Sequence, residues 1–214
     1  MSEGSPVVHV VDDDRSFLLA VSRLLKAAGY AVKTFASATA FLDEPGDIPG
    51  CIVADLRMPG MTGLELQQAL VSRANVLPVV FLTGEGDIPT TVMAMRQGAE
   101  DFLTKTAPKE ELFAAIDRAI ARNARQRDDS ARRRALQDRV SILTPREFGV
   151  LRQVVEGRLN KQIAADLGIT ERTVKLHRTA LTNKLQVRSV AELTRLVQAA
   201  GLFDEPTSTF PKGQ

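Results

Sequence analysis

The segment Cys51-Ile52-Val53-Ala54-Asp55 is a short apolar run that ends in a carboxylate. Residues 7–11 form a similar run, which is followed directly by Asp12 and Asp13. Between residues 7 and 122, runs of this kind alternate with longer stretches whose apolar residues recur at helical spacing. This alternation is typical of a parallel sheet covered on both faces by helices, with right-handed connections. We therefore expect an α/β domain at the start of the chain.

The pattern predicts five strands and five helices in this first domain. The expected strands are residues 7–11, 31–35, 51–54, 78–82 and 101–103. The expected helices are residues 17–28, 38–42, 64–71, 90–95 and 111–120. We interpret each strand as continuously apolar, as burial on both faces requires. The predicted fold is a doubly wound, five-stranded, flavodoxin-like parallel sheet over residues 1–122.

Residues 121–141 differ from the preceding sequence, since they contain seven Arg and three Asp but no Pro or Gly. Ala and Arg favour helix, and the apolar stripe is too sparse for a core, so residues 123–141 are predicted to form a helical linker. We interpret the arginines of this linker as a solvated face. Residues 204–214 are predicted to be a disordered tail.

Residues 142–203 are predicted to form an all-α helix-turn-helix domain. Thr144-Pro145-Arg146-Glu147 can cap the first helix with a capping box, and Gly157 can end it. The further expected helices are residues 161–167, which end at Gly168, residues 171 to about 184, which follow Thr170, and a last helix from Arg188-Ser189 to near Gly201.

Composition and charge limit the class of protein. The 214 residues are 44% hydrophobic and 25% charged, which is typical of globular proteins. The single cysteine, Cys51, cannot form an internal disulfide, and no segment reaches the ~20 apolar residues of a membrane helix. We expect a soluble, cytoplasmic protein with no membrane partner. Residues 1–125 carry a net charge of −4 and residues 126–214 one of +6, so either the surfaces simply differ or an acidic site is joined to a polyanion-binding domain.

Polar groups follow the expected strands at their carboxyl ends. They are Asp12, Asp13, Asp55, Thr83 and Lys105. In a doubly wound sheet these ends converge on one crevice. Three neighbouring carboxylates repel one another unless a cation joins them, and hard oxygen ligands favour Mg²⁺. Carboxylates, a divalent metal, a hydroxyl and an ammonium together form a plausible set for phosphoryl transfer.

Several motifs in residues 6–122 resemble the receiver domain of bacterial two-component response regulators. They are residues 10–14, 55–63, 83–84 and 98–105. The resemblance implies that Asp55 is the phosphorylated carboxylate and that a sensor histidine kinase is the phosphodonor. It also implies that Asp13, Asp55 and the backbone carbonyl of Arg57 bind Mg²⁺ directly, while Asp12 acts on the metal mainly through water. Thr83 would bind the phosphoryl group, Lys105 would pair with it, and Phe102 would be the switch aromatic.

The residue after Lys105 departs from the receiver pattern. Receivers usually have Pro there, in a cis peptide, whereas this chain has Thr106. A cis bond before Thr would cost ~3 kcal/mol rather than the ~0.5 to 1 kcal/mol of an X-Pro bond. We expect a trans bond or a rearranged loop, which would affect the placement of Lys105. A further hypothesis is that Arg57 and Glu85 form an ion pair over the entrance to the site and influence hydrolysis of the phosphoryl group.

The third helix of the second domain has one apolar and one polar face. Val174, Leu181 and Leu185 share the first, whereas the second suits the DNA major groove. The capping box, residues 160–161, 173–177 and 184–185 resemble the LuxR-type helix-turn-helix output domain. The resemblance places Lys175, Leu176 and Thr179 at bases, and Lys161, Thr173, His177, Lys184 and Arg188 nearer the DNA backbone. His177 could equally be structural, and we interpret His9 as a satisfied core residue.

The two domains together, with residues 84–89, resemble the FixJ branch of the response regulators. This resemblance implies a transcriptional regulator in which phosphorylation of Asp55 promotes receiver dimerisation through Val92 and Arg96 and binding to promoter DNA. Leu193 and Val197 either add a second dimer contact or belong to the core, and RNA polymerase is a further possible partner.

Two alternatives to this interpretation remain. One is an enzyme that turns over a small substrate through an aspartyl phosphate, although the sequence shows no additional acid/base pair and no phosphate-binding Gly loop. We therefore expect no turnover enzyme. The other is a phosphorylation-independent DNA-binding or interaction module whose receiver does not switch.

Overall fold

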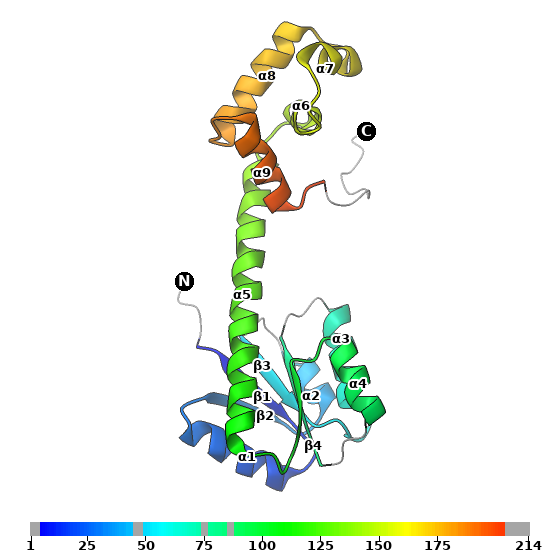
Figure 1. The fold of residues 1–214 in the computed structure, drawn as a ribbon, viewed down its shortest axis with the longest axis vertical. Coiled ribbons are helices and arrows are strands. Elements are labelled where there is room, and N and C mark those ends of the chain that lie inside the picture. The colour runs from blue at the N-terminus through cyan, green and yellow to red at the C-terminus, as the bar shows by residue number, and fades with distance from the viewer. Residues whose placement is uncertain (1–4, 45–48, 74–76, 85–87, 204–214) are drawn as a thin grey trace. The chain divides into compact units, whose positions relative to one another are not determined.

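The computed structural model describes residues 5–44, 49–73, 77–84 and 88–203 (Figure 1). The chain forms two compact units, Met1–Arg127 and Asp128–Gln214. Among the described residues, no helix has the length and apolar character needed to cross a membrane.

The first unit is built on one five-stranded sheet. Its strands are β1 (Val7–Val11), β2 (Ala31–Phe35), β3 (Gly50–Ala54), β4 (Val79–Thr83) and β5 (Asp101–Thr104). They pair in parallel in the order β2-β1-β3-β4-β5. This order confirms the predicted doubly wound sheet. Its direction of winding reverses between β1 and β3, which is where ligands bind in such sheets.

Helices cover both faces of this sheet (Figure 1). The helices are α1 (Arg15–Ala27), α2 (Ala38–Leu42), α3 (Gly63–Ser72), α4 (Ile88–Arg96) and α5 (Lys109–Ser141). Leu25 of α1 and Ile116 of α5 share one buried cluster with Val8 and Val10. On the opposite face, α2, α3 and α4 pack against the other side chains of the strands, in a cluster that includes Leu66. The alternation of side chains along β1 therefore supplies both cores.

The prediction that every strand is continuously apolar is wrong for β2. Lys33 and Thr34 of this strand are exposed. The physical reason is that β2 lies at the edge of the sheet and pairs only with β1. The central strands β3 and β4 are buried along their whole length, as predicted.

The last helix of the first unit continues through the predicted helical linker. A single helix, α5, covers Lys109–Ser141, so the helix expected at residues 111–120 and the helical linker expected at residues 123–141 are continuous. The linker residues are thus helical, and they contribute more to a core than expected. Val140 is buried in the core of the second unit, and Leu136 and Leu143 pack against it.

The second unit is all-helical. Its further helices are α6 (Pro145–Val155), α7 (Asn160–Leu167), α8 (Glu171–Lys184) and α9 (Val190–Ala200). Thr144 and Glu147 form the predicted capping box at the start of α6. Leu193 and Val197 of α9 are each 1% exposed, so they belong to the core and offer no surface for a dimer contact. The predicted tail at residues 204–214 lies outside the described residues.

Candidate functional site

The parallel register of the sheet brings the acidic residues together. Val11 pairs with Ala54, and the Asp55 amide donates to the Val11 carbonyl oxygen at 2.8 Å. Asp12 and Asp55 therefore follow neighbouring strands at the same edge of the sheet. One carboxylate oxygen from each of Asp12, Asp13 and Asp55 lies within 4.8 Å of the others.

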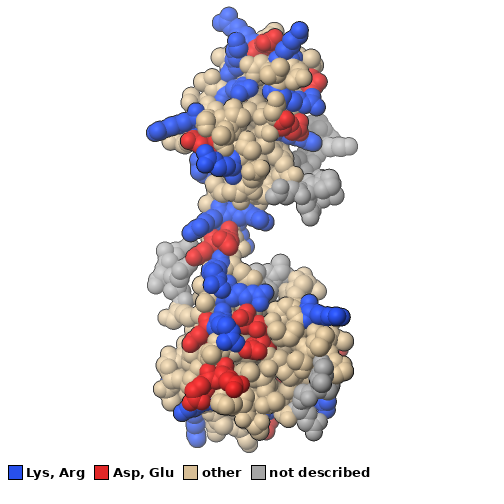
Figure 2. All heavy atoms as spheres, in the orientation of Figure 1, with Lys and Arg blue, Asp and Glu red and all other residues tan. Residues whose placement is uncertain are grey.

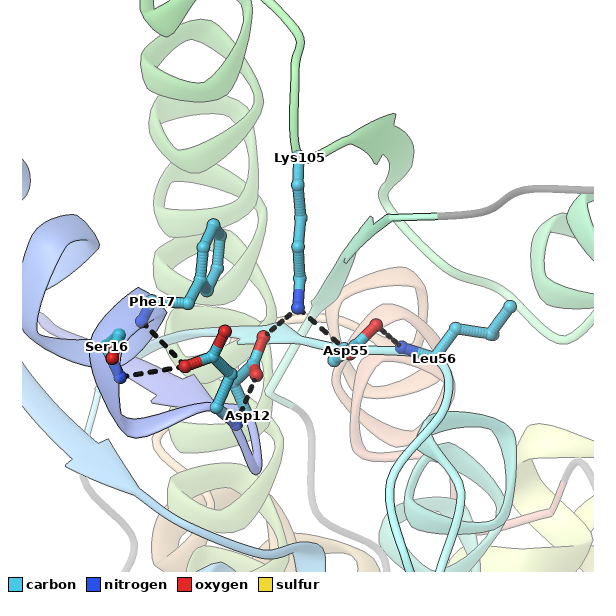
Figure 3. A network of polar contacts seen from close by, with 7 residues as sticks. Asp12, Ser16, Phe17, Asp55, Leu56 and Lys105 are labelled. Carbon is cyan, nitrogen blue, oxygen red and sulfur yellow. Dashed lines mark hydrogen bonds and ion pairs between the residues drawn. The ribbon is translucent and has the colours of Figure 1, made fainter.

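Backbone amides orient two of these carboxylates (Figure 3). Asp12 is 1% exposed, and its Oδ1 accepts from the Asp14 amide at 2.9 Å. Asp55 is also buried, and its Oδ1 accepts from the Leu56 amide at 2.7 Å. Asp13 is exposed. The cluster thus has two fixed carboxylates in its interior and one at its surface.

Lys105 reaches the cluster from the end of β5. Its Nζ lies 2.6 Å from Asp12 Oδ2 and 3.0 Å from Asp55 Oδ2 (Figure 3). The Lys105 amide donates to the Thr83 carbonyl oxygen at 2.7 Å, which places the start of the side chain beside β4. The peptide bond before Thr106 is trans, as predicted. The ammonium therefore reaches both carboxylates without the cis bond usual in receivers.

The pKa values of the two most enclosed charged groups reflect this arrangement. Burial raises the pKa of the Asp12 carboxyl, although the Lys105 ammonium and the Asp14 amide oppose the shift. Burial lowers the pKa of the Lys105 ammonium, but its interactions with Asp12 and Asp55 together outweigh this effect and raise the pKa. The acidic cluster therefore favours a nearby cation, and the Lys105 ammonium occupies that place in this structure.

An aromatic contact at this site was not predicted. The Lys105 ammonium lies over the Phe17 ring, 4.3 Å from its centroid (Figure 3). Phe17 belongs to the first turn of α1, and its spacing in the sequence predicted only a helical residue. The contact joins residues 88 positions apart in the chain, so no local pattern could have indicated it.

The other predicted receiver residues also lie around this edge of the sheet. Thr83 ends β4 and is 1% exposed. Phe102 is half-buried on β5, with its ring 6.2 Å from that of Phe81. Arg57 follows Asp55 by two residues and is exposed. Glu85, its predicted partner, lies outside the described residues.

The donor set of the cluster fits Mg²⁺. Carboxylates are the hard oxygen ligands that Mg²⁺ prefers, and one or two of them commonly suffice because the ion keeps several waters. Here three carboxylate oxygens come within 4.8 Å of one another. Asp12 and Asp55 are buried, so water screens their negative charges only weakly. A divalent cation between them would relieve their repulsion.

The second candidate site is the outer face of α8. Gly168 ends α7 in the left-handed conformation (φ 64°), and Thr170 caps α8 by accepting from the Thr173 amide at 3.2 Å. Val174 and Leu181 face the core, as predicted. Of the predicted DNA contacts, Thr173 and His177 are half-buried, and the others are exposed, namely Lys161, Lys175, Leu176, Thr179, Lys184 and Arg188. Leu176 stands out because an apolar side chain is 64% exposed there.

Lys and Arg side chains are prominent on the visible face of the second unit (Figure 2). One lysine of this unit, Lys184, has a buried acidic partner that the sequence did not predict. The Lys184 ammonium donates to Glu147 Oε2 at 2.7 Å, and Glu147 is 5% exposed. This bond lowers the pKa of the Glu147 carboxyl, with help from the Thr144 amide. Lys184, which was predicted to lie near the DNA backbone, therefore also contacts the capping box of α6, and it remains exposed.

The predicted dimer residues Val92 and Arg96 are both exposed on α4. Met93 and Met95 on the same helix are also exposed, at 50% and 46%. The exposed apolar surface of α4 thus includes two residues beyond Val92, which was the only apolar residue named in the prediction.

His9 is buried in the core, as predicted, but it is not satisfied there. Its ring is 2% exposed and lies 5.4 Å from the Phe41 ring and 6.0 Å from the Phe35 ring. Neither ring nitrogen has a hydrogen-bond partner among the described residues. Burial is the main reason that the pKa of His9 is lowered, and the nearby Lys33 adds to the shift.

Two family models match the chain and agree with this division into two units. The response regulator receiver domain matches residues 8–117, and the luxR family of bacterial regulatory proteins matches residues 141–197.

Similar proteins cover nearly the whole chain. FixJ of Azorhizobium caulinodans is 41% identical over 98% of this chain and its own full length. The response regulator protein TmoT of Ectopseudomonas mendocina is 40% identical over 92% of this chain and 90% of its own. Among solved structures, the response regulator StyR is 44% identical over 91% of this chain and 99% of its own, with a TM-score of 0.77. Full-length FixJ from B. japonicum is 37% identical over 92% of this chain and 98% of its own, with a TM-score of 0.56.

The chain therefore belongs to the response regulators. Within them it is a FixJ-like member, with a receiver domain followed by a LuxR-type DNA-binding domain, as the motifs predicted. A receiver domain implies a histidine kinase partner, and a LuxR-type domain implies DNA binding. The relative FixJ is a transcriptional regulatory protein, which is consistent with a role of this chain in transcription.

Proposed function

We propose that a sensor histidine kinase phosphorylates Asp55 and that this modification promotes receiver dimerisation and binding to promoter DNA. The observation that carries the proposal is the cluster at the carboxyl ends of β1 and β3. There the Asp55 carboxylate lies within 4.8 Å of two other carboxylates, and its Oδ2 lies 3.0 Å from the Lys105 ammonium.

The phosphoryl group would pass from a phosphohistidine of the kinase to an Asp55 carboxylate oxygen. The P–N bond breaks and its electron pair stays with the imidazole, while the carboxylate oxygen forms the new P–O bond. With Asp55 Oδ1 held by the Leu56 amide, Oδ2 is the oxygen on the side of Lys105. Thr83 at the end of β4 would donate to an oxygen of the transferred group, and Lys105 would pair with another.

Asp12, Asp13, Asp55 and the Arg57 carbonyl would hold Mg²⁺, which, when bound, neutralises charge on the phosphoryl oxygens. Before modification, the Lys105 ammonium already offsets the charge of Asp12 and Asp55. The same ammonium can turn toward the phosphoryl group because its side chain is long and remains 20% exposed.

The phosphorylated receiver would dimerise through α4. Val92, Met93 and Met95 offer an exposed apolar surface on this helix, with Arg96 at its end. Burying such side chains between two copies is favourable, and a dimer presents two α8 helices to two DNA half-sites. Lys175, Leu176 and Thr179 would face bases, because Lys can donate to guanine and Leu can meet a thymine methyl.

Phosphodonor treatment tests the proposal on the full chain. The chain would be incubated with Mg²⁺ and acetyl phosphate, and modification of Asp55 would be followed by intact mass and peptide mapping. Light scattering and selection of fragments from genomic DNA would report association and DNA binding, with Asp55→Asn as the control. We expect phosphorylation to increase association and DNA binding in the unsubstituted chain and to change neither in the Asp55→Asn chain. If phosphorylation changes neither association nor DNA binding of the unsubstituted chain, a phosphorylation-independent module is the better interpretation.

A further inference from the structure

The Lys105 ammonium is enclosed on more than one side by groups of different chemistry. Asp12 Oδ2 and Asp55 Oδ2 lie 2.6 and 3.0 Å away, and the Phe17 ring centroid lies 4.3 Å away. We propose that Phe17 is a positioning residue, whose ring holds the ammonium at the place where it meets the phosphoryl group on Asp55. This inference rests on the proposed phosphorylation of Asp55.

The backbone and the ring of Phe17 are each held in place. Asp14 caps α1, and its Oδ1 accepts from the amides of Ser16 and Phe17 at 2.8 and 3.2 Å. The same short segment contains Asp12, so the cap ties the Phe17 backbone to the segment that carries the acidic cluster. The ring also packs against the buried cluster that α1 shares with α5. A ring held in this way can act as a fixed contact for a mobile side chain.

The two carboxylates do not by themselves hold the Lys105 ammonium in one position. Lys105 follows an edge strand, and the turn after it contains Thr106, which is exposed. Lysine is a point charge on a flexible four-carbon stem, so two carboxylates alone set its distance from them but not its direction of approach. An aromatic face attracts the ammonium electrostatically and also excludes water from that side. The ring and the carboxylates together define one position.

A fluorination series at residue 17 tests this electrostatic role. Phe17 would be replaced in the full chain by phenylalanines with one, two and three ring fluorines, which weaken the negative face of the ring while changing its size little. The measured quantity is the initial rate of Asp55 phosphorylation with Mg²⁺ and acetyl phosphate. We expect the rate to fall stepwise with each fluorine, by roughly three- to tenfold for three fluorines. Phe17→Trp, with a more electron-rich face, should retain the rate better than Phe17→Leu.

Phe113 provides a matched control. Its ring packs against the same buried cluster, beside Tyr30 at 5.9 Å. The same fluorinated residues at position 113 should leave the rate unchanged. A flat rate across the series at position 17, with a slower Phe17→Leu variant, would show that the ring only packs and would overturn the inference alone. Failure of the unsubstituted chain to become phosphorylated at residue 55 would overturn the proposed function itself.

Discussion

Gly63, the first residue of α3, approaches the backbone of the proposed phosphoacceptor very closely. A Cβ at this position would lie 2.4 Å from the Asp55 carbonyl oxygen and 2.8 Å from Phe81 Cε1. The Gly63 amide also donates to the Leu56 carbonyl oxygen at 3.0 Å, so the helix cannot shift without breaking a bond. Overpacking of this kind costs about 1–3 kcal/mol, and the intrinsic gain of Gly→Ala offsets about 0.5–1 kcal/mol. We expect Gly63→Ala to destabilise the first unit by about 1–2 kcal/mol and to slow phosphorylation of Asp55.

Tyrosine fluorescence during urea unfolding can measure this effect in the full chain. Tyr30 is the only tyrosine and there is no tryptophan, so the signal reports on the first unit. Gly149→Ala is the matched control. Gly149 lies inside α6, and a Cβ there would lie 3.8 Å from Leu167 Cδ2, which is an ordinary van der Waals contact. The Gly149→Ala substitution should stabilise the second unit by about 0.5–1 kcal/mol, which urea unfolding followed by circular dichroism would measure. A Gly63→Ala chain that unfolds at the same or a higher urea concentration than the unsubstituted chain would refute the reasoning.

Two further predictions concern buried or half-buried charges. The folded-state pKa of His9 is lowered, so its contribution to stability is complete above the unfolded pKa of about 6.5 and is lost as the pH falls below it. Urea unfolding of the first unit between pH 7.5 and 5 should show this loss, and His9→Leu should flatten it; parallel profiles for the two chains would contradict it. Lys184→Met should lower the melting temperature of the second unit at pH 7, because Glu147 loses its cation, and this difference should shrink as the pH falls through the Glu147 titration. If Lys184→Met instead weakens DNA binding and its salt dependence with no loss of stability, Lys184 contacts phosphate after all.

The fold was predictable because local patterns and global architecture agree in this chain. The central strands are apolar throughout, and Thr144 with Glu147 forms a capping box that needs no distant partner. The errors occurred where the tertiary position of an element overrides its local pattern. An edge strand tolerates Lys33, and the sparse stripe of the linker helix is sufficient because Val140 joins a core already formed by α6 to α9.

Which side chains meet inside the sites could be predicted only in part. Asp12 and Asp55 follow neighbouring parallel strands, so their proximity follows from topology alone. Topology also places Lys105 near these carboxylates, but the other contacts of the two lysines do not follow from it. Lys105 meets Phe17, and Lys184 meets Glu147, because a flexible side chain can reach any of several groups and the packing of the helices decides among them.

The contact between Lys105 and Phe17 also explains why a receiver can lack the usual Pro after this lysine. The Lys105 amide is fixed by the Thr83 carbonyl oxygen, and its ammonium is fixed by two carboxylates and a ring. A side chain held at both ends depends little on the conformation of the turn that follows it. Thr106→Pro should therefore change the rate of Asp55 phosphorylation less than Phe17→Leu does, because the turn is exposed whereas the ring contacts the charge itself.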